Sequence, residues 1–102
     1  MSINEIREEI ISRKIIFFIE ANRHISMPLQ NLMLMLARNN LFMEATAQCS
    51  RTFDPEKLYN FLKNIVFSEI SGTESQIMEQ SENRFEEIRV KAIEWIIATF
   101  TR

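Results

Sequence analysis

Two side chains in the sequence have the chemistry of a nucleophile and a general base, Cys49 and His24. Nucleophilic catalysis needs the thiol and the imidazole within hydrogen-bonding reach of each other, but the two residues fall on different predicted elements. A free cysteine is usually a small, buried and inert hydrophobic side chain, and His24 follows the end of the first predicted helix. The pair therefore does not predict an active site.

Acidic residues gather at positions 5–9 and 82–87. The sequence lacks the Glu-x-x-His spacing of di-metal bundles, and Glu87 precedes Lys91 by four residues, the spacing of a solvated ion pair on a helix. Gly72 is the only glycine, so a glycine-rich phosphate loop cannot be assembled. The single cysteine excludes a disulfide within the chain and a zinc site with several thiolates. We therefore expect a protein that is not an enzyme and that binds no cofactor and no metal.

The 102 residues suffice for one hydrophobic core but not for two, so we expect a single domain over residues 1–102. One Gly and two Pro are too few for the many tight turns of an all-β protein, which favours an all-α fold. The formal net charge of −2 does not favour broad binding to nucleic acid or anionic lipid. The apolar run at residues 15–19 is too short for a membrane span or a signal peptide. We expect a cytoplasmic protein with no membrane association.

Local signals predict where the helices begin and end. Capping boxes or an N-cap followed by proline mark three helix starts, at Ser2 with Glu5, at Asp54 with Pro55, and at Thr73 with Gln76. Apolar residues recur at three- and four-residue spacing after each start. The predicted helices cover residues 3–21, 27–39, 41–51, 55–68 and 74–101.

The last predicted helix is long for a domain of this size. From residue 74 to 101 it would extend about 40 Å, while a compact domain of about 100 residues has a radius of gyration near 13 Å. Its first half offers only Ile77 and Met78 as apolar contacts. Two alternatives stay open: a break near residues 81–83, or a polar half that projects from the body. The predicted fold is a compact bundle of four to five helices with a long C-terminal helix.

Three segments, at residues 15–19, 32–37 and 92–98, are apolar almost all round. One small bundle has few positions that are buried on every side, so we expect part of this apolar surface to be covered by a partner. The sequence thus predicts an adaptor, inhibitor or regulatory subunit that binds itself as a homodimer or binds another protein. The candidate interface residues are Phe17, Phe18, Met33, Met35, Trp95, Ile96 and Phe100.

A second interpretation is a small DNA-binding regulator. Residues 27–51 could form a helix-turn-helix-like hairpin, with Gln48 and Arg51 placed to contact base edges. Residues 23–53 contain Arg23, Arg38 and Arg51 against Glu44, so this region is locally basic within an acidic protein. The hairpin predicts nucleic acid as the alternative partner.

Overall fold

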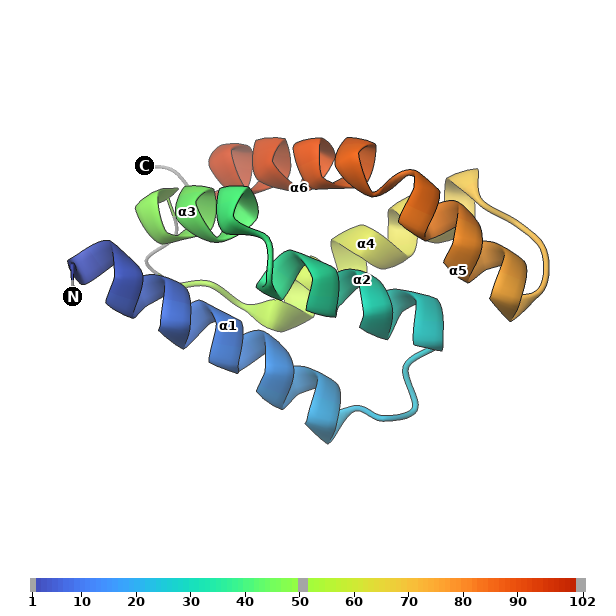
Figure 1. Cartoon of the computed structure of the whole chain (residues 1–102), viewed down its shortest axis with the longest axis horizontal. Coiled ribbons are helices and arrows are strands. Elements are labelled where there is room, and N and C mark those ends of the chain that lie inside the picture. The colour runs from blue at the N-terminus through green and yellow to red at the C-terminus, as the bar shows by residue number, and fades with distance from the viewer. Residues whose placement is uncertain (1, 50–51, 101–102) are drawn as a thin grey trace.

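A computed structural model describes residues 2–49 and 52–100, and its helices follow one another without a strand in these ranges (Figure 1). The helices are α1 (Ile3–Ala21), α2 (Met27–Ala37), α3 (Asn40–Cys49), α4 (Pro55–Glu69), α5 (Glu74–Asn83) and α6 (Phe85–Phe100). The all-α class is confirmed. The expectation of four to five helices is wrong by one or two, because the described residues form six.

The three predicted helix starts are all present. Ser2 Oγ accepts from the Glu5 amide at 3.1 Å while the Glu5 carboxylate accepts from the Ser2 amide, which completes a capping box. Thr73 and Gln76 form the second box at the start of α5. Asp54 accepts from the amide two residues later, directly before α4. Each motif satisfies backbone donors that a helix start would otherwise leave without a partner.

The second helix, α2, is the central element, as its apolar circumference predicts. It packs against α1, α3, α4 and α5, and Figure 1 shows it between α1 and α6. Its leucines Leu29, Leu32 and Leu36 are buried, and so is Gln30. The Gln30 amide donates to the carbonyl oxygens of residues 25 and 23, at 2.6 and 3.2 Å. This side chain therefore ties the α1–α2 loop to the core.

The predicted long C-terminal helix is two helices, α5 and α6. The break lies at Arg84, whose φ of −101° and ψ of 14° interrupt the helix. The Arg84 guanidinium donates to Glu69 at the end of α4, with 2.6 Å between Nη2 and Oε1. The polar half does not project, because α5 folds back onto α2. Of the two alternatives, the break is confirmed, one residue after the predicted segment.

The chain is compact enough for one core. The radius of gyration over Cα atoms is 13.2 Å, which is the value expected for about 100 residues in one domain. Buried side chains from all helices but α5 form one hydrophobic cluster. Among the described residues, no helix has the length and hydropathy needed to cross a bilayer.

Candidate functional site

The two residues with catalytic chemistry do not meet. His24 is exposed in the loop between α1 and α2, and Cys49 is half-buried at the last residue of α3. These two places lie toward opposite ends of the molecule in Figure 1. Within residues 2–49 and 52–100, no three His, Cys, Asp or Glu side chains are grouped so that they could hold a metal ion.

Two of the seven candidate interface residues belong to the core of the chain itself. Met33 on α2 and Ile96 on α6 have 0% of their surface exposed. Both side chains belong to the hydrophobic cluster that these helices form with their neighbours. Met33 and Ile96 are therefore removed from the predicted interface.

Four further candidates are half-buried by contacts within the chain. Trp95 stacks on Phe61 of α4, with ring centroids 4.8 Å apart, and meets Phe100 edge-on at 5.6 Å. Phe18 lies 5.9 Å from the Tyr59 ring, and Met35 accepts a hydrogen bond from the Asn31 amide. These side chains join α6 and α1 to α4, or close one turn of α2, so most of their surface is used within the fold.

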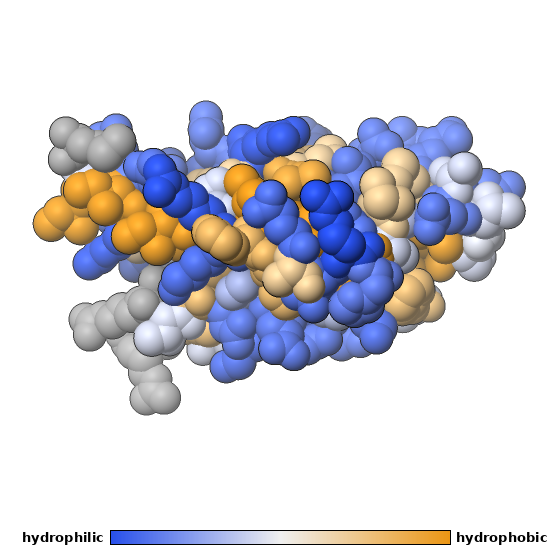
Figure 2. Space-filling view, turned by 90° about the horizontal axis from the view of Figure 1, so that it is seen from below, coloured by the Kyte–Doolittle hydropathy of each residue, from blue (hydrophilic) through white to orange (hydrophobic). Residues whose placement is uncertain are grey.

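Phe17 differs from the other six candidates because it is 72% exposed. Three isoleucines share its side of α1: Ile3, Ile6 and Ile10 are 68%, 44% and 49% exposed. Positions 3, 6, 10 and 17 fall on one side of an α-helix with 3.6 residues per turn. We call these four side chains the α1 stripe. Figure 2 shows hydrophobic side chains gathered on this face, most densely at the end where α1 begins.

The α1 stripe lies on the opposite side of the helix from the contacts that hold α1 to the bundle. Those contacts are made by Ile11, Ile15 and Ile19, which are buried. Ile3, Ile6 and Ile10 are apolar like these buried isoleucines, but they lie on the side of α1 that does not meet the core. The four-residue spacing of the buried isoleucines was the available signal.

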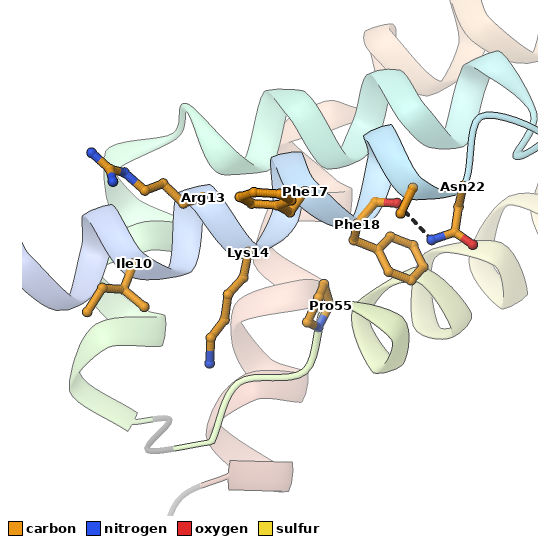
Figure 3. A pocket seen from close by; sticks show the side chains of 8 residues that line it. Ile10, Arg13, Lys14, Phe17, Phe18, Asn22 and Pro55 are labelled. Atoms are coloured by element: carbon orange, nitrogen blue, oxygen red, sulfur yellow. Dashed lines mark hydrogen bonds between the residues drawn. The ribbon is translucent and has the colours of Figure 1, made fainter.

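A groove runs beside the α1 stripe, between α1 and the start of α4 (Figure 3). It has a volume of about 550 Å³ and is lined by Ile10, Arg13, Lys14, Phe17, Phe18, Ala21, Asn22 and Pro55. We call it the α1 groove. Asn22 closes one end, where its amide donates to the Phe18 carbonyl oxygen at 2.8 Å. Ile10 and Phe17 belong to both the stripe and the groove, so the two form one continuous apolar surface.

The charged side chains on this surface are basic. Arg13 and Lys14 line the α1 groove, and no acidic residue is among its described lining residues. Arg13 forms an ion pair with Glu9 at 2.6 Å, one turn earlier in α1. Lys14 makes no ion pair with any residue in the described ranges. The surface offers apolar contact and positive charge, and none of its lining residues is a nucleophile paired with a base.

The main charge cluster lies elsewhere, at the α5–α6 junction. Arg84 bridges Glu69 and Glu87, and Lys91 lies 3.4 Å from each carboxylate. Hydrogen bonds from the Arg84 guanidinium hold the pKa of both carboxyl groups below the ordinary value. The same bonds, first that to Glu87, raise the pKa of Arg84. These groups satisfy one another, so the cluster joins three helices and does not resemble a catalytic site.

The predicted DNA-binding hairpin consists of α2 and α3, joined at residues 38–39. Gln48 is exposed on α3, whereas Arg51 lies outside the described residues. The other exposed side chains of α3 include Leu41 and Glu44, and residues 40–49 contain no Lys or Arg. Phosphate contacts depend on basic side chains, so the described part of α3 does not favour this alternative, which stays a prediction.

No protein-family model matches this chain, and comparisons with curated proteins and with solved structures likewise give no match.

Proposed function

We propose that the chain is a non-enzymatic protein-interaction module, acting as an adaptor, inhibitor or regulatory subunit, and that its binding surface is the α1 stripe with the adjoining α1 groove. The observation that supports this most directly is the exposure of Phe17, 72% of whose surface is open where the α1 stripe meets the α1 groove. Buried aromatic anchors supply much of the energy of protein interfaces. Contiguous apolar surface of this kind is typical of binding sites on soluble domains.

The chemistry of the surface supports a protein partner over a small reactive substrate. Its apolar side chains line up along one helix, a form that suits the apolar face of another helix. Lys14 and Arg13 stand beside this face and would orient a partner that carries acidic side chains. A partner of this kind is either a second copy of the chain or another protein.

The experiment is an affinity capture from lysate of the cells that produce the protein, with and without nuclease. The bait is the wild-type chain, Phe17→Ser or Phe67→Ser. Phe67 is a matched control because it is 58% exposed on α4, away from the α1 groove. We expect specific proteins, or untagged copies of the chain, to be retained by wild type and Phe67→Ser, to be lost with Phe17→Ser, and to resist nuclease.

Equal capture by all three baits would contradict the proposal, because the α1 surface would then contribute nothing to binding. Capture that disappears after nuclease treatment would contradict it as well. That result would favour the DNA-binding alternative and would be followed by a titration of duplex DNA at increasing salt.

A further inference from the structure

The α1 stripe runs along most of α1, whereas the α1 groove lies beside the second half of the helix. The first half of α1 presents Ile3 and Ile6, while the second half presents Phe17 above the groove. Ile10 lies between the two halves, at the start of the groove. Ile3 and Phe17 are each seven residues from Ile10, which corresponds to two turns, or about 10 Å, on either side. The exposed surface of α1 is therefore spaced evenly about Ile10.

Charge divides the same helix into two halves. Residues 2–9 contain Glu5, Glu8 and Glu9 against Arg7, a net charge of −2. Residues 10–21 contain Arg13 and Lys14 against Glu20, a net charge of +1. A copy of α1 turned end for end would place its acidic half beside the basic half of the first, and would also oppose the two helix dipoles.

We infer that a second copy of this chain covers the α1 surface, through an antiparallel contact of the two α1 helices about a two-fold axis near Ile10. This inference rests on the proposed function and names its partner. The Ile10 side chains of the two copies meet at the axis. Ile3 packs on Phe17 of the other copy, and Glu9 lies beside Arg13 of the other copy. Such an interface is self-complementary, as a two-fold contact requires.

A parallel pair of the same helices would lack this match. In a parallel pair each half of α1 would face the same half of the other copy. The basic residues of both copies would then lie side by side, and so would the acidic residues. A parallel pair would also align the two helix dipoles. The antiparallel arrangement places Glu9 beside Arg13 of the other copy and fills the α1 groove of both copies in a single contact, while Arg7 lies level with the basic residues of the other copy.

The dimer should be weak. Each copy contributes chiefly one helix of 19 residues, about 28 Å long. A contact of this kind is smaller than the ~800 Å² per partner of a standard interface. We therefore expect a dissociation constant in the micromolar range, which sedimentation velocity between about 1 and 500 µM would measure.

In that experiment the wild type should pass from monomer to dimer as its concentration rises. Phe17→Ser should raise the dissociation constant at least tenfold, and the control Phe67→Ser should leave it unchanged within twofold. A chain that stays monomeric throughout would overturn the inference, and so would a dimer that is indifferent to Phe17→Ser. If such a monomer still captures other proteins through Phe17, only this inference fails; if that capture fails as well, the proposed function falls with it.

A charge exchange tests the contact between Glu9 and Arg13. Glu9→Lys and Arg13→Glu should each weaken self-association about fivefold, because like charges then face each other across the axis. Mixing the two variants restores two unlike pairs per dimer, so the mixture should associate as tightly as the wild type. A mixture no tighter than either variant alone would overturn the inferred register.

A spin label tests the direction of the helices. The label is attached at Glu20→Cys, in a Cys49→Ser background, because residue 20 is exposed near the end of α1. With the axis near Ile10, each label lies ten residues from the axis, so the two labels should be about 30 Å apart along the helix direction. A distance below about 15 Å would show parallel helices and would overturn the inference.

Discussion

Alanine substitutions of Ile15 and Phe17 test whether α1 has one buried and one exposed face. Ile15 has 0% of its surface exposed, and removing such a side chain costs about 2–5 kcal/mol of unfolding free energy. Phe17 is 72% exposed, so only 28% of it is buried. Full burial of a phenylalanine contributes about 1.5–3 kcal/mol, and the corresponding share is about 0.4–0.8 kcal/mol. Alanine regains about 0.5 kcal/mol through its higher helix propensity, so Phe17→Ala should be nearly neutral.

Urea denaturation at about 1 µM protein, monitored by the fluorescence of Trp95, measures the unfolding free energy of both variants. Trp95 is a suitable probe because it stacks on Phe61 in the folded chain. If α1 is oriented as described, Ile15→Ala lowers the unfolding free energy by at least about 2 kcal/mol and Phe17→Ala by less than about 1 kcal/mol. A loss above about 2 kcal/mol for Phe17→Ala, or below about 1 kcal/mol for Ile15→Ala, would refute the assignment of the two faces. Ile15→Val, with an expected cost of about 0.5–1.5 kcal/mol, replaces Ile15→Ala if the latter does not fold.

Three further substitutions test other parts of the fold, and urea denaturation measures each of them. Hydrogen bonds from Arg84 lower the pKa of Glu69 and Glu87, so the stabilisation from these bonds is present above the ordinary carboxyl pKa and is lost as the pH falls below that pKa. Arg84→Ala should remove this part of the pH dependence of stability. An acid denaturation profile unchanged by Arg84→Ala would contradict the prediction. Ser81 is 1% exposed and its hydroxyl has no hydrogen-bond partner among the described residues. Ser81→Ala should therefore raise the unfolding free energy by about 1 kcal/mol. A lower unfolding free energy would show that the hydroxyl has a hydrogen-bond partner. Gly72 has a φ of 125°, and an added Cβ would lie 2.4 Å from Gln76 Oε1, so Gly72→Ala should cost about 1–3 kcal/mol, and a neutral result would show that the loop relaxes.

The helix starts could be predicted from the sequence because each depends on residues within one turn. Ser2 with Glu5, and Thr73 with Gln76, satisfy backbone donors that lie only three positions apart. The break at Arg84 is different in kind, because the guanidinium binds Glu69, fifteen residues away on another helix. Periodicity within one segment carries no information about that contact, so the sequence left the continuous helix and the break as alternatives.

The candidate binding surface could be predicted only in part, for a similar reason. The excess of apolar residues at 15–19 was visible in the sequence, and Phe17 does lie on the surface. The excess at 32–37 and 92–98 is mostly absorbed by the core, because α2 has neighbours on several sides and Ile96 is fully buried. How many sides of a helix are covered depends on the packing of the whole chain, which hydrophobic periodicity does not specify.

The helix α5 has a consequence for how the molecule opens. Ser81 is its one buried residue, while α4 before it and α6 after it each contribute several side chains to the core. A helix with so little buried apolar surface can detach at a free-energy cost well below that of global unfolding. Amide hydrogens of residues 77–83 should therefore exchange with solvent before those of α2, and a protease should first cut near residues 71–74. Because α5 covers α2, each such opening would briefly expose the most apolar helix of the chain.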